Sequence, residues 1–179
     1  MSVAAKILPH YTYNEWVNWE GRWEIIDGIP YAMSPMPVPK HQSIASNLGA
    51  VFFNALRNCK KCKPFQAIDY KVSEETIVQP DFLVVCNEIE KSFLDFPPAL
   101  LIEILSPSTA LKDRHTKFGI YEKERVPYYL IIDPKKEEVE IYLLNKEGAY
   151  ELALQGKNIS YTFNFGDECN AAIDFAEIW

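Results

Sequence analysis

Two stretches, IVQPDFLVV at residues 77–85 and LLIEILSPST at residues 100–109, decide how this chain folds and where its chemistry lies. Each is a short apolar run typical of a buried strand, and each holds one acid, Asp81 or Glu103, where an apolar residue would be expected. Removing a carboxylate from water is costly unless the group is paired, hydrogen-bonded or bound to a metal. The two acids therefore indicate a functional site.

The two acids together favour a metal site. Side chains alternate along a strand, and Glu103 is the only polar side chain from Leu101 to Leu105. If Asp81 lies on the neighbouring strand and faces the same way, both carboxylates converge on one hard cation, which prefers oxygen ligands. Mg²⁺ is the natural candidate, with Mn²⁺ as a substitute. Taken singly, each acid could instead pair with a buried Lys or Arg, or lie at a strand end in solvent.

The residues before these strands predict a short helix, a hairpin and a long helix. Residues 12–20 hold scattered apolar positions and predict a short helix that begins at Thr12. The Asp27-Gly28 pair within WEIIDGIPYAM is a strong hairpin signal. Residues 41–59 place apolar side chains at helical spacing, which predicts an amphipathic helix covering one face of a sheet.

The rest of the chain is rich in predicted strands. They fall at residues 65–72, 77–86, 99–105, 126–133 and 137–144, with two or three more short strands to follow. Residues 109–124 have few helix breakers and predict a helix. Because the strands both pair locally and flank helices, we expect an α+β fold in which helices flank a central mixed sheet.

Composition narrows the class of protein. At 179 residues with 48% hydrophobic composition, the chain can bury one substantial core, so we expect a single domain over residues 1–179. Its formal net charge of -7 argues against a protein that coats nucleic acid through bulk positive potential. No run approaches the roughly 18 apolar residues of a membrane span, and the opening residues lack the apolar region of a secretory signal. We therefore expect a soluble cytoplasmic protein.

The cysteines and the basic residues give weaker signals. Only Cys59 and Cys62 form a CxxC pair, and no second pair stands at zinc-ribbon spacing, so we expect ordinary reduced thiols. Two local basic clusters occur: Arg57 with Lys60, Lys61 and Lys63, and Lys112 with Arg114, His115 and Lys117. For the first cluster, cations suited to a helix C-terminus are favoured over DNA contact.

The order of the motifs resembles a known family. Pro80-Asp81, with Glu103 in a later apolar strand, looks like the PD-(D/E)XK nuclease motif. More narrowly, residues 20–135 resemble the Uma-two family in the order of WEIIDGIPYAMSP, HQ, VQPDFLVV, LIEILSPST, Asp113, Lys117, Tyr121 and VPYYLIIDP. The resemblance implies a restriction-endonuclease-like core and a magnesium-dependent endonuclease. Its substrate would be nucleic acid, with DNA favoured, and a homodimer would suit the two strands of a duplex.

One departure from the general nuclease motif concerns its lysine. The position two residues after Glu103 holds Leu105, which cannot orient water. In the Uma-two family, a lysine on the following helix matches Lys117, with Asp113 and Tyr121 four residues to either side on one helical face. Without the resemblance, Asp113 and Lys117 would be interpreted as a surface ion pair. The resemblance makes Lys117 a candidate catalytic residue and Asp113 and Tyr121 candidate site residues.

Three further positions match residues that are often identical in the family: Glu24, His41 and Asp69. Glu24 or Asp69 could hold a second cation. Alternatively, Glu24 is a solvent-facing strand residue, His41 a residue at the start of a helix, and Asp69 an acid near a turn. Tyr128 and Leu130 depart from the family, which commonly has Glu and Trp at these places, so local packing or partner contacts should differ there.

The resemblance also implies a mechanism. Asp81, Glu103 and the carbonyl of Ile104 would hold Mg²⁺, and Lys117 would orient the attacking water or stabilise developing charge. The alternative is a catalytically inactive module of the nuclease fold that binds protein or nucleic acid. The net charge mildly favours that alternative, whereas an intact set of two acids and a lysine favours the enzyme.

Overall fold

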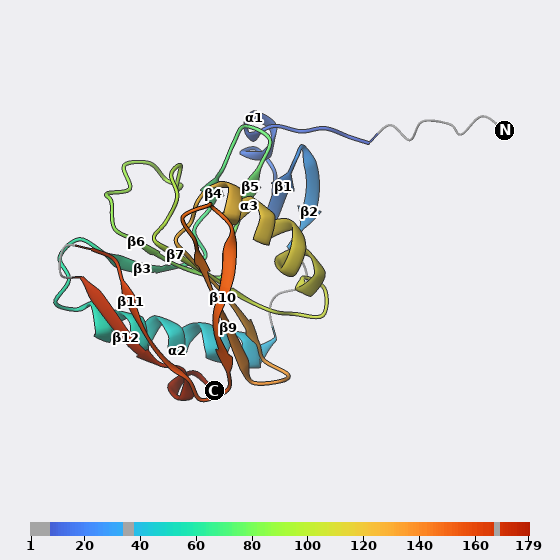
Figure 1. The fold of residues 1–179 in the computed structure, drawn as a ribbon. Coiled ribbons are helices and arrows are strands. Elements are labelled where there is room, and N and C mark those ends of the chain that lie inside the picture. The colour runs from blue at the N-terminus through green and yellow to red at the C-terminus, as the bar shows by residue number, and fades with distance from the viewer. Residues whose placement is uncertain (1–7, 34–37, 167–168) are drawn as a thin grey trace.

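A six-stranded mixed sheet forms the centre of the computed structural model, which describes residues 8–33, 38–166 and 169–179 (Figure 1). In the order in which they pair, its strands are β10 (Tyr150–Gly156), β9 (Glu138–Leu144), β8 (Tyr128–Asp133), β7 (Leu100–Ile104), β6 (Phe82–Val85) and β3 (Lys63–Gln66). Strands β7 and β8 are parallel, and the other neighbours are antiparallel. The predicted mixed sheet is confirmed.

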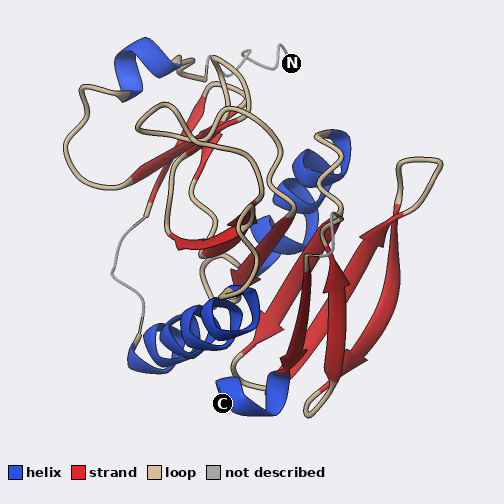
Figure 2. Cartoon of the chain, turned by 90° about the vertical axis from the view of Figure 1, so that its left-hand side faces the viewer, coloured by secondary structure: helices blue, strands red, loops and turns tan. Residues whose placement is uncertain are grey.

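A second sheet of four short strands stands beside the first (Figure 2). In pairing order, its strands are β2 (Ile29–Ala32), β1 (Trp23–Ile26), β5 (Ile77–Val78) and β4 (Tyr70–Lys71). The turn between β1 and β2 is the predicted hairpin, with positive φ values of 49° at Asp27 and 75° at Gly28. Two successive positive φ values are what a tight two-residue hairpin turn requires, and Asp-Gly accepts them readily.

The predicted strands 65–72 and 77–86 are each divided between the two sheets, so the prediction of continuous strands is wrong. Ala67 breaks the first with a φ of 47°, and Pro80, which lacks a backbone N–H, stands between β5 and β6 in the second. Asp81 therefore lies at the junction of the sheets, immediately before β6, and not in the interior of a strand.

The helices follow the predictions in place but not in every detail. They are α1 (Tyr13–Trp16), α2 (Pro39–Leu56), a π-helix (Lys112–Lys117) that continues into α3 (Phe118–Lys123), and a terminal 3-10 helix (Phe175–Ile178). Helix α1 begins after Thr12 as predicted, and Glu15 accepts a 2.7 Å hydrogen bond from the Thr12 amide, but the helix ends early. The π-helical turn was not predicted. Among the described residues, no helix is both long and apolar enough to cross a membrane.

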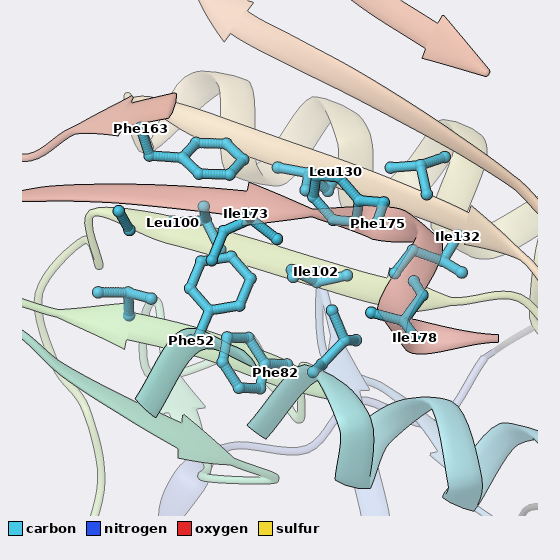
Figure 3. Packing of buried hydrophobic residues seen from close by; sticks show 14 of the residues in the cluster. Phe52, Phe82, Leu100, Ile102, Leu130, Ile132, Phe163, Ile173, Phe175 and Ile178 are labelled. Carbon is cyan, nitrogen blue, oxygen red and sulfur yellow. The ribbon is translucent and has the colours of Figure 1, made fainter. Parts of the chain in front are cut away.

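Two hydrophobic layers cover the two faces of the central sheet. Helix α2, the hairpin of β11 (Ser160–Asn164) and β12 (Asn170–Asp174), and the 3-10 helix cover one face, where Phe52 packs against Phe82 (Figure 3). Helix α3 and the π-helix lie over the other face, where Tyr121 packs with Leu83 and Leu101. Because side chains alternate, Glu103 points to this second face.

The four cysteines form two disulfides, Cys59–Cys169 and Cys62–Cys86. The expectation of reduced thiols is therefore wrong for this structure. The CxxC turn follows α2, whereas Cys86 follows β6 and Cys169 precedes β12. Only the folded chain brings these segments together, so their linear spacing could not show the pairing.

Candidate metal and catalytic site

A cleft of about 1340 Å³ lies where the two sheets and the π-helix meet. Of the predicted site residues, those that line it are His41, Asp81, Glu103, Ile104, Asp113 and Lys117. Glu24, Tyr121 and Asp69 are not among the lining residues, but each bonds to one that is: Lys117, Glu103 and Gln79, in that order. A smaller hollow of about 320 Å³ between α2 and β3 is lined by no charged side chain and is not a candidate.

Asp81 lies on the same face of the sheet as Glu103. Strand β6 turns Leu83 and Val85 toward the face of α3, so by alternation Asp81 faces that way too. Its Oδ2 accepts a 2.9 Å hydrogen bond from the Ile104 amide, which fixes it against the end of β7. The predicted convergence of the two acids on one cleft thus has a structural basis in the alternation of both strands.

His41 is the nearest basic group to Asp81. It lies on the buried face of α2, with its Nε2 3.3 Å from Asp81 Oδ2. Burial opposes a charge on the imidazole, but the hydrogen bond and the charge of Asp81 outweigh it and raise the pKa of His41. A protonated His41 would partly neutralise Asp81. His41 is therefore more than a residue at the start of a helix, because its side chain reaches the cleft.

Glu103 is buried at the base of the cleft, only 2% exposed. Its Oε1 accepts hydrogen bonds from the Tyr121 hydroxyl at 2.7 Å and from Lys117 Nζ at 3.0 Å. Burial raises the pKa of Glu103 well above its usual range; Lys117 opposes this rise, and the charges of Asp113, Asp81 and Glu24 add to it. Glu103 therefore holds a proton more readily than an ordinary glutamate.

Lys117 stands at the centre of three acids. Its Nζ lies 2.7 Å from Glu24 Oε1, 3.0 Å from Glu103 Oε1 and 3.7 Å from Asp113 Oδ1. Burial would lower the pKa of Lys117, but the three carboxylates outweigh it and raise that pKa well above the usual range. The side chain is 2% exposed, so the interpretation of Asp113 and Lys117 as a surface ion pair is wrong. The π-helical turn that carries both is a feature frequent at functional sites.

Glu24 already has cationic partners for both of its oxygens. Oε1 contacts Lys117 and accepts a 2.9 Å hydrogen bond from the Gln79 amide, while Oε2 pairs with Lys112. Burial raises the pKa of Glu24, but the two lysines lower it by more, so the group stays ionised. A second cation at Glu24 would have to displace a lysine. Asp69 is not among the lining residues and is bonded to the side chain of Gln79, which does line the cleft, so Asp69 is a poor ligand for a shared cation as well.

Asp113 offers an unsatisfied oxygen. Its side chain is 1% exposed, and within the described part of the chain its Oδ1 has no hydrogen-bond partner. Burial raises the pKa of Asp113, and Lys117 opposes the rise. Lys117 Nζ lies 3.7 Å from this oxygen, beyond hydrogen-bond distance, so the oxygen has a charge partner and can still bind a ligand that enters the cleft.

Sequence reasoning missed Lys112 and Gln79 as parts of the site. Lys112 was noted only within a basic cluster, and Gln79 only within VQPD. In the structure, Lys112 pairs with Glu24, and Gln79 bridges Glu24, Asp69 and Arg22. Glu24, the partner that Lys112 and Gln79 share, lies far away in the sequence on β1, so only a search for a base to pair with this buried acid could have suggested them.

Glu103 should make the stability of the metal-free protein depend on pH. Because burial raises its folded-state pKa, its contribution to stability is complete below the unfolded pKa and is lost as pH rises through the folded pKa. Glutamine mimics the protonated side chain. Glu103→Gln should therefore raise the Tm relative to the unsubstituted protein by more at about pH 8 than at about pH 5. Thermal unfolding in the presence of chelator measures the Tm of both proteins at each pH. An equal Tm difference at the two pH values would contradict the raised pKa of Glu103.

A mixed sheet with two acids and a lysine converging on a cleft at its edge defines a restriction-endonuclease-like protein. Residues 11–166 match the model of the Uma2 family, described as "Putative restriction endonuclease", and the chain belongs to this family. The match extends beyond the predicted span on both sides. Family and fold together support a nuclease.

Two similar proteins extend the comparison. An uncharacterized protein of Synechocystis sp. is 30% identical over 150 residues, which cover 79% of this chain and 78% of that protein. The crystal structure of a putative nuclease belonging to DUF820 from Anabaena variabilis has a TM-score of 0.73 and 19% identity, covering 93% of this chain and 96% of that one. At this identity the structural likeness shows the fold, which confirms the predicted fold class.

Proposed function

We propose that this protein is a Mg²⁺-dependent endonuclease that hydrolyses phosphodiester bonds of nucleic acid, with DNA as the favoured substrate. The observation that carries the proposal is the meeting of Asp81, Glu103 and Lys117 in one cleft, from three separate elements. Each of the three is costly to hold there without chemistry that uses it, because two are buried charges and the third is a carboxylate tied to a histidine.

The residues fit a hard cation. Asp81, Glu103 and the carbonyl of Ile104 supply oxygen ligands, and Asp113 adds an oxygen without a donor. Within the described ranges, groups of three or more acidic, histidine or cysteine ligands within 4.8 Å of one another occur only at the cysteines. No three described carboxylates of the cleft therefore meet at one point, and an ion there would be held by one or two of them, with its other places taken by water and substrate phosphate, as is usual for Mg²⁺.

The side chains have separate tasks in this mechanism. When bound, Mg²⁺ would polarise the scissile phosphate and lower the pKa of an attacking water. Lys117 remains charged and would stabilise negative charge that develops on the phosphate. The hydrogen bonds from Tyr121 and Lys117 both end on Oε1 of Glu103, so neither engages Oε2, an oxygen that a cation could use. Asp81 is oriented by the Ile104 amide.

The rim of the cleft can receive a polyanion. Arg22, Lys40, His115 and Lys135 lie among its lining residues and would contact phosphates of a nucleic acid. The protein carries a net charge of -7, so this attraction would be local. A homodimer that presents two clefts to the two strands of a duplex is part of the proposal.

The second candidate, an inactive nuclease-fold module, is favoured by the pairing of the cations. Lys112 is neutralised by Glu24, and Arg114 by two hydrogen bonds to Glu140 at 2.9 and 2.7 Å. A panel of single- and double-stranded DNA and RNA, incubated with Mg²⁺, Mn²⁺ or chelator, discriminates between the two functions. We expect metal-dependent cleavage that Glu103→Gln abolishes. Absence of cleavage across the panel, or equal cleavage by Glu103→Gln, would contradict the endonuclease.

A further inference from the structure

The four cysteines gather in one cluster at an end of the hydrophobic core, away from the acidic cleft. They are Cys59, Cys62, Cys86 and Cys169. The Sγ atoms of Cys59, Cys62 and Cys169 all lie within 4.8 Å of one another, and the fourth sulfur is bonded to Cys62. None of the four lines the acidic cleft. The two disulfides are therefore adjacent: three of the sulfurs form one close group, and Cys86 is joined to it through Cys62.

This convergence exceeds what two disulfides need. A disulfide requires only that its own two cysteines approach each other. Here the turn between α2 and β3 supplies two sulfurs, and the end of β6 and the start of β12 supply one each. Helix α2 and β12 pack together, as Figure 1 shows. Four sulfurs from three separate segments in one place are what a tetrahedral metal ion requires.

The surroundings of the cluster also suit thiolates. The Cys62 amide lies 3.3 Å from Cys59 Sγ and donates a hydrogen bond to it. Hydrogen bonds to sulfur stabilise the thiolate and tune thiolate metal sites. The exposed side chains of Lys60 and Lys63 flank the CxxC turn. Their positive charge favours thiolates and offsets the charge of four thiolates around one divalent ion, which gives the first basic cluster a role besides that of a helix C-terminus.

We propose that the reduced protein binds one Zn²⁺ ion through these four cysteines, as a structural site separate from the acidic cleft. Each disulfide takes two electrons and two protons from a dithiol reductant, which is itself oxidised to a disulfide, so two reductant molecules free four thiols. Zn²⁺ then displaces the four thiol protons. With Zn–S bonds of about 2.3 Å, tetrahedral geometry places the sulfurs about 3.8 Å apart. This spacing suits Cys59, Cys62 and Cys169, whose Sγ atoms lie within 4.8 Å of one another, and Cys86 would complete the set once it is released from its bond to Cys62.

The proposed ion would join the C-terminal end of α2 to β3, β6 and β12, the same segments that the disulfides join. The disulfide and zinc forms exclude each other, since a sulfur in a disulfide is no longer a thiolate. Oxidation would therefore release the metal and keep the segments connected. A soft thiolate set selects Zn²⁺ over Mg²⁺, so the two metal sites would not compete for the same ion.

The full chain, reduced with a dithiol and stripped of metal, tests the site by Co²⁺ titration. We expect one equivalent of Co²⁺ to give an intense thiolate-to-cobalt charge-transfer band and the visible bands of tetrahedral cobalt, and one equivalent of Zn²⁺ to abolish both. The oxidised protein should give neither. A reduced protein without a charge-transfer band, or one whose four thiols all stay reactive at saturating Zn²⁺, would overturn the proposal.

Two substitutions test whether the cysteines bind the cobalt that gives the charge-transfer band. Cys86→Ser should weaken Zn²⁺ binding by more than about 100-fold, because even partners one shell beyond the metal ligands contribute about 10–100-fold. Asp81→Asn is the matched control, since it alters the acidic cleft and should leave the cobalt spectrum unchanged. Loss of the charge-transfer band in Asp81→Asn, or its retention at full affinity in Cys86→Ser, would assign the cobalt to other ligands and overturn the site. If Cys86→Ser fails to fold, the titration of the unsubstituted protein still tests the site.

Discussion

Replacing Lys117 with methionine should lower the free energy of unfolding by about 3–5 kcal/mol, the cost typical of removing one partner from a buried ion pair. The substitution leaves Glu24, Glu103 and Asp113 facing one another without the cation between them. The cost is larger than for a surface lysine because Lys117 is only 2% exposed, so water cannot replace the lost charge. Denaturant unfolding measures the loss.

Lys91→Met provides the matched control for Lys117→Met. Lys91 pairs with Asp95 at the same spacing of four residues as Asp113 and Lys117, but the side chains of Lys91 and Asp95 are 56% and 36% exposed. An exposed pair of this kind contributes little to stability, because water and salt screen its charges, so Lys91→Met should change the free energy of unfolding far less than Lys117→Met. Equal losses in the two variants would contradict the buried role of Lys117.

The Lys117 substitution should also lower turnover, by about 100-fold or more, if its charge stabilises the transition state. Lys117→Arg separates this effect from folding, because it keeps the positive charge near the acids and changes the position of the donors. Turnover measured on the folded fraction of each variant is the test. Full activity in folded Lys117→Met would remove Lys117 from the catalytic group and leave it a structural cation.

Asp81→Asn should reduce turnover by about 100- to 1000-fold while the fold persists. The asparagine oxygen can still accept the hydrogen bond from the Ile104 amide, but the side chain loses the negative charge that a cation needs. Glu103→Gln should combine a similar loss of turnover with a higher Tm at neutral pH, since it removes a buried charge. A buried charge that lowers stability, so that its neutralisation raises the Tm, is typical of a functional site.

Asp69→Asn is the control for both acids. Asp69 is bonded to Gln79 and lies outside the cleft lining, so its substitution should change turnover by less than about tenfold. Rates of cleavage under saturating Mg²⁺ compare the three variants. If Asp69→Asn lost as much activity as Asp81→Asn, the catalytic acids would have to be reassigned.

The sequence predicted most elements of the fold because their signals are local. The Asp27-Gly28 turn and the apolar face of α2 appear where they were expected. The division of residues 65–72 and 77–86 between two sheets was missed, because each segment has strand-favouring residues on both sides of its break. A positive φ at Ala67 has no signature in composition, and Pro80 lay inside the predicted strand 77–86 although it marks the break between the sheets.

The candidate site was predicted in part for a similar reason. Asp81 and Glu103 contrast with their apolar neighbours, and that contrast can be seen in the linear sequence. Lys117 could be placed only by resemblance, since its burial depends on a π-helical turn that no periodicity revealed. The pairing of Lys112 with Glu24 joins residues far apart in the chain and was not foreseen. The cysteine cluster likewise depends on contacts between distant segments.

Calorimetric titration of Mg²⁺ or Mn²⁺ into the reduced full chain tests the central claim most directly, namely that Asp81 and Glu103 hold the catalytic metal. The predicted result is binding of one ion per chain that weakens as pH falls from about 7 to 5, because protons compete for Glu103, and that is lost in both Asp81→Asn and Glu103→Gln. Binding that is absent in the unsubstituted protein, or unchanged in the two variants, would contradict the account.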